Sequence, residues 1–373
     1  MTTTSTQGSP ELAATRRLPS LDGWRALCII SVLGAHCRKS DAFPKELDRL
    51  FWWLFDGGLG VRCFFLISGF LITWLLLKEA TACGKIDLKS FYYRRFLRIF
   101  PVYGAFLLVL FILQSMTSYR QDMYIWLGNW TFTTNFSSEN PWPSAHLWSL
   151  AVEEQFYLLW PGLLGFCVSA GSVRKVYVFL ILAIVIAPVW RVVSFLKLFP
   201  AGLAPLFSAS SFFNYCDSLA IGCVAAFAFM RLHGKVESFV FHHPLRLSVI
   251  GVLLLCLPKA LGQFNSLNIV IIPLRDTAQA LGLVVLVLQS LFMPGVARYR
   301  LLNHPWVMHV GVLSYSLYIW QQLFCSPASE FGLTAVWWMS FPGWLVPAFS
   351  MGILSYHCFE RPLLSWRGRL RKV

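Results

Sequence analysis

The side chains with the clearest chemical capacity are charged residues inside apolar stretches. Arg25 and His36 stand eleven positions apart in one such stretch. A helix would place them on one face, about 16 Å apart along its axis. This spacing suits an extended anionic substrate whose charged end lies near Arg25 and whose reactive end lies near a histidine base. The alternative is an arginine that reaches toward lipid headgroups and an interfacial histidine.

A second apolar stretch carries two adjacent carboxylates, Glu153 and Glu154. His146, Glu153 and Tyr157 follow i, i+7, i+11 spacing, so they line one stripe of a helix. Carboxylates inside a membrane segment are costly and usually functional. We expect at least one of them to face a wet cavity or to pair with a cation, for which three arginines are available: Arg25, Arg62 and Arg95.

Two further arginines, Arg95 and Arg98, are three positions apart and share a helical face. Such a guanidinium pair suits phosphate groups, although anchoring on the cytoplasmic side of a membrane is an alternative explanation. Glu360 lies at the end of the last apolar stretch, where a surface ion pair with Arg361 is the simplest structural explanation.

The chain that must position these residues has 373 residues, of which 57% are hydrophobic and only 13% charged. Soluble domains carry roughly 25% charged residues, so the composition excludes an ordinary soluble globule and a disordered chain. We predict an all-α, polytopic membrane bundle. The ten cysteines form no C-x-x-C pair, so we expect buried core residues and no metal site.

Apolar segments long enough to cross a bilayer indicate about ten transmembrane helices. The segments lie near 21–37, 59–77, 97–116, 145–167, 176–196, 212–230, 245–261, 268–292, 306–326 and 334–358.

Most Lys and Arg residues fall in connections that lie inside if the N-terminus is cytoplasmic, as the positive-inside rule requires. We therefore expect both termini in the cytoplasm. This topology accounts for most of the net charge of +14, and we expect no nucleic-acid partner. Residues 1–20 are predicted to be a disordered cytoplasmic tail, with a cleaved signal peptide as the alternative. Residues 21–362 form the transmembrane domain, and 363–373 form a basic cytoplasmic tail.

These segments resemble the acyltransferase 3 family of membrane O-acyltransferases. The resemblance is collinear from about residue 20 to 362. It rests on six motifs: Leu21 to Ala26 with His36; the run that contains Phe65, Ser68 and Gly69; Arg95 with Arg98; the block from His146 through Trp148 and Glu153 to Tyr157; Leu313 to Trp320; and Phe359 to Pro362 with Glu360.

The resemblance implies transfer of an acyl group, commonly acetyl, from cytoplasmic acyl-CoA to a sugar hydroxyl. No bound cofactor is implied, and the expected location is the bacterial inner membrane. Family acceptors include surface polysaccharides, peptidoglycan, nodulation oligosaccharides and macrolide antibiotics. The family pattern makes His36 the catalytic histidine and assigns donor binding to Arg95 and Arg98. Arg25 is the basic partner of His36 in that pattern.

Several points depart from the family or stay open. Many members have a histidine after the motif that here ends at Trp320, where this chain has Gln321, so that segment receives no predicted role. Glu153 or Glu154 is expected to orient His36 or to position the acceptor. Any extracytoplasmic transfer partner is expected to be a separate protein.

Parts of the sequence are also compatible with two other functions. His36 and Asp41 fit the H-x4-D spacing of glycerolipid acyltransferases, but the other motifs of those enzymes are not evident. A secondary transporter also combines many spans with intramembrane charges, yet the sequence shows no convincing inverted repeat. An acyltransferase that acts on a glycan, or on a small glycosylated metabolite such as a macrolide, is the favoured hypothesis.

Overall fold

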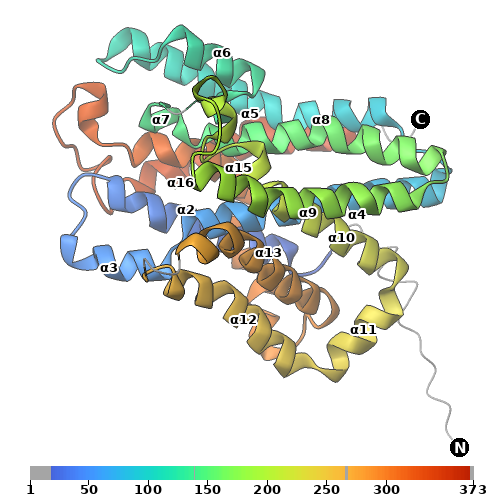
Figure 1. Cartoon of the computed structure of the whole chain (residues 1–373). Helices are drawn as coiled ribbons and strands as arrows, with labels where there is room; N and C mark the ends of the chain where they lie inside the picture. The colour runs from blue at the N-terminus through green and yellow to red at the C-terminus, as the bar shows by residue number, and fades with distance from the viewer. Residues whose placement is uncertain (1–17, 138, 265–267, 370–373) are drawn as a thin grey trace, which may run out of the picture.

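The chain folds as a bundle of helices that run side by side for most of their length (Figure 1). The computed structural model describes residues 18–137, 139–264 and 268–369. Within these ranges no β-strand forms, and the single bridge of that type joins Asp41 to Ser340. The predicted all-α class is confirmed. Most of the predicted N-terminal tail (residues 1–17) and the last residues of the C-terminal tail (370–373) lie outside the described residues.

Each of the predicted apolar segments contains a helix. The helices are α2 (Leu21–His36), α4 (Gly57–Cys83), α5 (Leu88–Met116), α8 (Leu147–Ser169), α9 (Val173–Phe195), α10 (Cys216–Arg231), α12 (Pro244–Leu261), α13 (Asn268–Phe292), α15 (Pro305–Phe324) and α16 (Leu345–Ser355). Arg95 and Arg98 therefore lie inside the long helix α5 and not in the connection before it.

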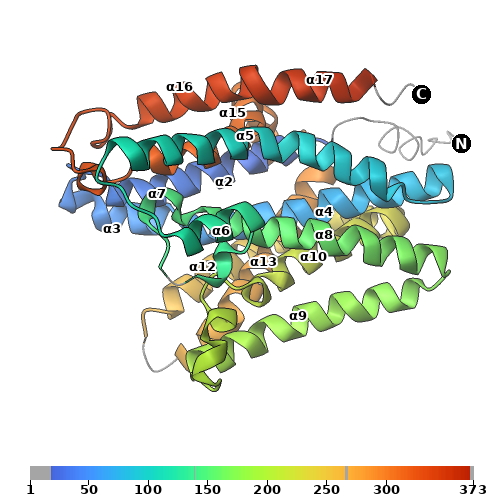
Figure 2. The same ribbon diagram turned by 90° about the horizontal axis from the view of Figure 1, so that it is seen from above.

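Helix length and composition identify fewer membrane spans than the prediction. Among the described residues, 5 helices are long and apolar enough to cross a membrane, or up to 6 if α10 and the bent helix after it, α11 (His233–His242), form one span. Helices α2 and α10 have only 16 residues each, and α8 carries two glutamates. The count of ten spans stays a prediction. The start of α2 and the end of the last helix, α17 (Arg361–Arg369), lie toward the same end of the bundle (Figure 2).

Four helices form a central row in the order α15, α2, α4 and α10, each packed on the next. Glycine lets α4 and α10 approach closely. A Cβ atom on Gly69 would lie 2.1 Å from the Leu219 carbonyl oxygen, and one on Gly222 would lie 2.1 Å from that of Leu66. Such close contact through small residues is typical of membrane helices. The predicted motif residue Gly69 thus has a packing role.

The outer helices are far less buried inside the protein than the central row. In the most apolar part of α12 only 6% of residues are buried inside the protein, against 72% for the segment that contains α4. Leucine and valine side chains of α9 and α12 point outward. Apolar outer helices therefore surround central helices that carry the buried polar residues, which is how a bundle shields polar groups from lipid.

The last predicted span, 334–358, begins later and ends later than expected. Turns occupy the chain before α16, where Pro342 and Gly343 interrupt the helical pattern. From Leu345 the helix continues through a π-helical turn (Tyr356–Glu360) into α17 (Arg361–Arg369). Part of the predicted C-terminal tail is therefore helical.

The two long connections pack at the end of the bundle where α2 ends. The first contains α3 (Lys45–Leu54), and the second contains α6 (Met123–Thr131) and α7 (Trp142–Ala145). Figure 1 shows α3 and α7 at this end. In the first connection, the Asp41 carboxylate accepts a hydrogen bond from the Ala328 backbone N–H at 2.8 Å. Both connections are thus positioned to shape the surroundings of His36.

Candidate active site

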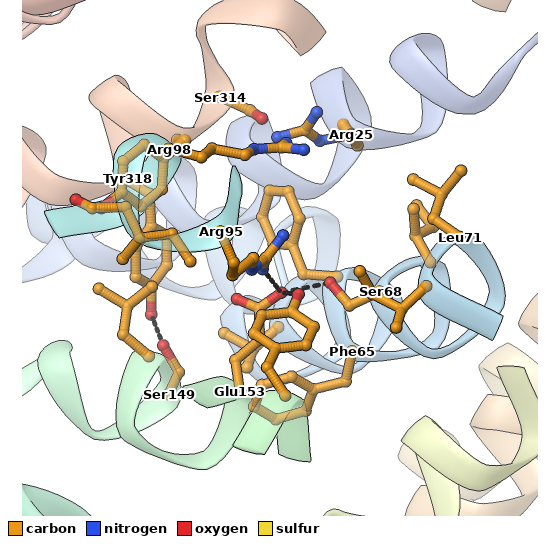
Figure 3. Close-up of a pocket in the computed structure, with 18 of the residues that line it drawn as sticks. Arg25, Phe65, Ser68, Leu71, Arg95, Arg98, Ser149, Glu153, Ser314 and Tyr318 are labelled. Atoms are coloured by element: carbon orange, nitrogen blue, oxygen red, sulfur yellow. Dashed lines mark hydrogen bonds and ion pairs between the residues drawn. The ribbon is translucent and has the colours of Figure 1, made fainter. Parts of the chain in front are cut away.

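A cavity of about 110 Å³ lies between α2, α4, α5, α8 and α15. Its walls combine apolar side chains with a group of polar residues that come from four of these helices (Figure 3). We call that group the cavity cluster: Arg25, Ser68, Arg95, Arg98, Glu153 and Tyr157. Residues from five of the six motifs line this cavity, because Ser314 and Tyr318 of α15 add to the cavity cluster. The sequence predicted the members of the cluster only as separate candidates.

Glu153 is the centre of the cavity cluster. Its carboxylate accepts hydrogen bonds from the hydroxyls of Ser68 and Tyr157, and Nη2 of Arg95 lies 3.5 Å from Oε1. Glu153 and Tyr157 are one turn apart on α8, so their side chains meet on the same face. The expectation that a glutamate pairs with a cation is confirmed, and the cation is Arg95.

Arg95 is held from three directions. Its guanidinium lies 3.4 Å from the centre of the Tyr157 ring, and its Nε lies 3.9 Å from a carboxylate oxygen of Glu154. Stacking on an aromatic face and pairing with two carboxylates fix the orientation of the group. Arg95 is therefore largely neutralised by the protein itself.

Arg98 and Arg25 differ from Arg95, although Arg95 and Arg98 were predicted to act as a pair. The guanidinium groups of Arg25 and Arg98 lie beside each other along one wall of the cavity (Figure 3). Among the described residues neither takes part in an ion pair. Two adjacent cations with free hydrogen-bond donors can bind a polyanion.

His36 lies outside this cavity, at the far end of α2. Its Nδ1 is 3.1 Å from Oε1 of Gln321 on α15, and its ring meets the edge of Trp142 at a centroid distance of 5.4 Å. Trp142 belongs to the second long connection, which therefore covers the histidine. Neither Glu153 nor Glu154 is its hydrogen-bond partner in the described structure. The structure thus separates the predicted base from the predicted carboxylates.

A layer of buried aromatic and hydroxyl side chains lies between the cavity and His36. The Tyr318 hydroxyl is 2.5 Å from the Ser149 hydroxyl, and His146 is edge-on to both Phe106 and Tyr318. His146 also contacts the Ile319 carbonyl at 3.0 Å. We call these residues the Tyr318 layer: Phe106, His146, Ser149 and Tyr318. On α15 the cavity ends at Tyr318, and Gln321 follows about one turn later.

A second hollow of about 290 Å³ opens at the His36 end of the bundle. Arg38, Trp52, Asp56 and Lys259 are among its lining residues. Lys259 pairs with Asp56 at 3.7 Å and lies over the Trp52 ring at 4.6 Å. The hollow therefore combines an aromatic face with polar groups.

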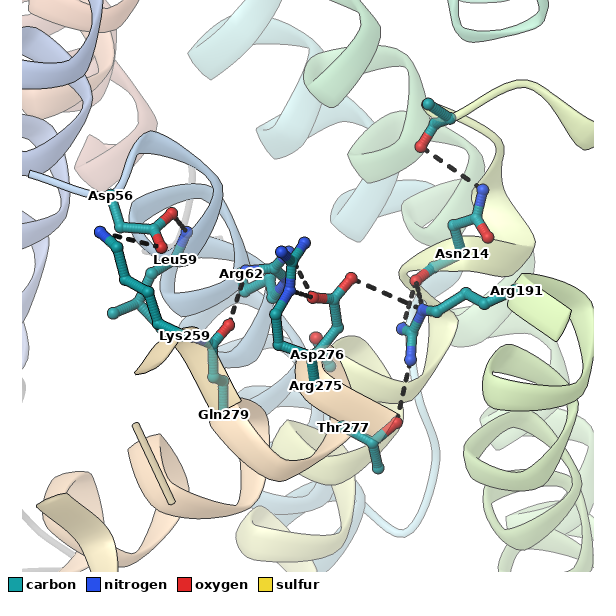
Figure 4. Close-up of polar contacts among 12 residues, drawn as sticks. Asp56, Leu59, Arg62, Arg191, Asn214, Lys259, Arg275, Asp276, Thr277 and Gln279 are labelled. Atoms are coloured by element: carbon teal, nitrogen blue, oxygen red, sulfur yellow. Dashed lines mark hydrogen bonds and ion pairs between the residues drawn. The ribbon is translucent and has the colours of Figure 1, made fainter. Parts of the chain in front are cut away.

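A second group of buried charges links α4, α9, α10 and α13 (Figure 4). Arg62 lies 2.5 Å from Asp276, and Arg191 lies 2.8 Å from Asp217 and 3.6 Å from Asp276. We call these four residues the sealed cluster. None is more than 8% exposed, and none lines either cavity. Arg62, which the sequence offered as a partner for the glutamates, is bound here.

The remaining predicted motif residues have positions that explain their types. Phe65 packs edge-on against Trp148 at 6.3 Å and lines the cavity. Glu360 is 5% exposed and accepts a hydrogen bond from the Ser316 hydroxyl. The surface ion pair with Arg361 considered for Glu360 is therefore wrong, because the π-helical turn directs the carboxylate toward α15.

Sequence reasoning missed Gln321, Ser149, Tyr318 and the acidic half of the sealed cluster. Gln321 directly follows a recognised motif and received no role because many family members have a histidine there. Its contact with His36 depends on the packing of α15 against α2, which the sequence does not reveal. Asp217 and Asp276 were detectable as carboxylates in apolar segments, the same signal that identified Glu153.

A family model described as an acyltransferase domain matches residues 18–357. The chain is also similar to curated bacterial proteins. It is 37% identical over 172 residues to a protein of Staphylococcus aureus (strain COL) named "Putative O-acetyltransferase", covering 43% of this chain and 26% of the relative. It is 35% identical over 161 residues to the peptidoglycan O-acetyltransferase OatA of Listeria monocytogenes, covering 39% and 24%.

The O-acetyltransferase OatA of Staphylococcus aureus (strain NCTC 8325 / PS 47) is 34% identical over 176 residues, covering 43% of this chain and 27% of the relative. The chain thus spans about a quarter of the length of the curated relatives it matches. No solved structure matches it. Its apolar helices and its relatives identify a multi-pass membrane protein. The family match covers nearly the whole chain, and the protein belongs to the acyltransferase family of membrane O-acyltransferases.

Proposed function

We propose that the protein transfers an acetyl group from acyl-CoA to a hydroxyl of a sugar in a cell-surface or exported glycan. The observation that carries this proposal is the pair formed by Arg25 and Arg98, two guanidinium groups beside the cavity that have no ion-pair partner within the described part of the chain. The phosphates of a CoA molecule are anions of the kind that such a pair binds bidentately. The relatives named as O-acetyltransferases support the acetyl group.

In this proposal the donor enters from the cytoplasm, where both termini lie, and the protein resides in the bacterial inner membrane. Its phosphates bind Arg25 and Arg98, and its pantetheine arm extends toward His36. Arg25 and His36 are about 16 Å apart along α2, so only an extended molecule can contact both. The Tyr318 layer must move to let the thioester pass.

His36 then serves the transfer in one of two ways. It removes the proton of the sugar hydroxyl while the hydroxyl oxygen attacks the thioester carbon, or it first accepts the acetyl group on its ring nitrogen and passes it on. In both routes the C–S bond breaks, an ester C–O bond forms, and the hydroxyl proton ends on the CoA thiol. Arg95 pairs with Glu153, which lines the cavity through which the donor passes, and with Glu154 behind it.

We place the sugar acceptor at the His36 end of the bundle. The hollow beside Trp52 and Lys259 offers an aromatic face and charged groups there, and Trp142 covers His36 from the second long connection. Peptidoglycan, named for the Listeria relative, is the first glycan to test.

The test uses the full chain in lipid nanodiscs with radiolabelled acetyl-CoA and the surface-glycan fraction of the native host. We expect CoA release together with label in the glycan, and a loss of at least about a hundredfold in His36→Ala because general base catalysis contributes that much. The matched control is His309→Ala, which changes an exposed histidine on α15. Normal transfer by His36→Ala, or no acetyl-CoA consumption by the unmodified protein, would refute the proposal.

A further inference from the structure

We propose that Gln321 is a positioning residue that holds His36 with its proton on Nδ1 and its lone pair on Nε2. This inference rests on the proposed function, because it assigns the nitrogen of His36 that acts in acetyl transfer. The contact between His36 Nδ1 and Gln321 Oε1, at 3.1 Å, is the starting observation. An amide oxygen can only accept a hydrogen bond, so the histidine nitrogen that faces it must carry the proton.

The amide of Gln321 is itself oriented by a second donor. The Cys325 thiol, one turn further along α15, lies 3.7 Å from the same oxygen, so two donors converge on Oε1. The Gln321 side chain is 0% exposed, and it cannot rotate into solvent. The oxygen is thereby held toward His36, which fixes the tautomer of the imidazole.

The other half of the amide shows that packing alone does not explain this residue. Nε2 of Gln321 is buried without a hydrogen-bond partner in the part of the chain that the structure describes. A buried, unpaired donor lowers stability, and an apolar side chain of the same volume would avoid that cost. The carbonyl contact with His36 is therefore the property that distinguishes glutamine from methionine or leucine at this position.

The assignment matters for both routes of transfer. As a base, His36 takes the proton of the acceptor hydroxyl on Nε2 while the C–O bond forms and the C–S bond breaks; that proton then passes to the CoA thiolate. As an acyl carrier, the same lone pair attacks the thioester carbon and CoA leaves as the thiolate. Either route fails when the proton sits on Nε2, so Gln321 acts through His36 and touches no substrate.

The decisive comparison is between Gln321→Met and Gln321→Glu. Methionine has nearly the same shape but only a weak thioether acceptor, whereas a carboxylate accepts from Nδ1–H as the amide does. We measure kcat and KM for acetyl-CoA from CoA release by the full chain in nanodiscs. We expect Gln321→Met to lower kcat at least about tenfold, as part of the general-base contribution, with KM unchanged. Gln321→Glu should keep most of the activity.

Controls separate this inference from folding and from the proposed function. Gln289→Met removes another fully buried glutamine, on α13, and should leave kcat unchanged. Gln321→Asn draws the carbonyl back by one methylene and should repeat the loss if the methionine variant does not fold. Wild-type kcat in Gln321→Met, or equal losses in the methionine and glutamate variants, would overturn the positioning role. An active His36→Ala would instead refute the proposed function.

Discussion

The sealed cluster and the cavity cluster both combine arginines with carboxylates inside the bundle, yet they differ in how completely their charges are paired. In the sealed cluster Arg62 and Arg191 each contact an aspartate, and Thr277 donates a further hydrogen bond to Asp217 at 2.5 Å. In the cavity cluster Arg95 is paired, whereas Arg25 and Arg98 have no ion-pair partner among the described residues. The incompletely paired group lines the cavity of about 110 Å³, whereas no member of the sealed cluster lines either described cavity.

This difference separates a structural use of buried charge from a binding use. Removing a charge from water is costly, and a buried pair recovers that cost only when its geometry is complete. In the sealed cluster each arginine has an aspartate within 4 Å, although Nε of Arg62 has no hydrogen-bond partner among the described residues, and the cluster joins four helices. The cavity cluster leaves donors available, which is what a site for an anion requires.

The largest loss of stability is expected for a substitution in the sealed cluster. Asp217→Ala leaves Arg191 charged and buried, so the unfolding free energy should fall by about 3–5 kcal/mol. Thermal unfolding of the purified protein in detergent measures the loss. The double variant Arg191→Met with Asp217→Leu should recover most of the stability, because no charge is then left unpaired. A stable single variant would show that the cluster is not structural.

A smaller effect on stability is expected for Arg95. Arg95→Met removes the cation that faces Glu153 and Glu154, and it leaves their carboxylates unpaired beside a cavity. The expected loss is about 1–3 kcal/mol, together with lower transfer activity. Parallel measurement of unfolding temperature and CoA release tests both parts. Unchanged stability would show that Arg95 behaves like the unpaired Arg25 and Arg98.

Arg98 should affect donor affinity without affecting stability. A hydrogen bond to a charged group contributes roughly 1.5–3 kcal/mol, so Arg98→Gln should raise KM for acetyl-CoA about tenfold to a hundredfold. Unfolding temperature should stay near that of the unmodified protein. Acetyl-dephospho-CoA, which lacks the 3′-phosphate, discriminates further: its KM should be high with either protein if Arg98 binds that phosphate. An unchanged KM would remove Arg98 from the donor site.

The smallest loss of stability is expected for an exposed carboxylate, Asp87, with which the buried carboxylates of both clusters can be compared. Asp87 precedes α5, and hydrogen bonds from the Ser90 hydroxyl and backbone N–H hold the pKa of Asp87 below its usual range. Its stabilising contribution is therefore present above the ordinary aspartate pKa of about 3.9 and is lost as pH falls through the lower folded value.

Asp87→Ala should accordingly lower the unfolding temperature slightly at pH 7, and the difference from the unmodified protein should shrink in acid. Thermal unfolding at neutral and acidic pH measures this. A difference that grows toward low pH would contradict the assigned sign.

Much of the architecture was predictable because each membrane helix is marked by a local run of apolar residues. Apolar segments located the long helices. Glu153 and Tyr157 meet on one face of α8, as their spacing predicted, whereas His146 precedes α8 and lies in the Tyr318 layer. The last segment was misplaced because Pro342, Gly343 and a π-helical turn shift its helix toward the C-terminus. Apolar composition alone does not give the number of helices that cross the membrane, because central helices pack against one another and need less apolar surface toward lipid.

The candidate site was predictable only in its parts. Glu153 and Arg95 were both identified, but their pairing with Ser68 and Tyr157 depends on the meeting of α4, α5 and α8. Arg95 and Arg98 both line the cavity, as their shared helical face predicts, but their surroundings differ. Three residues of spacing put both on one face, yet only Arg95 reaches the carboxylates of α8.

The sequence by itself determined the class of protein, the helical segments and the family motifs, because hydrophobicity and spacing act along the chain. The tertiary structure decided which charges are paired, that Gln321 contacts His36, and that the Tyr318 layer separates His36 from the cavity. These features arise between helices far apart in sequence. Their distances depend on how side chains pack, and local patterns carry no information about that.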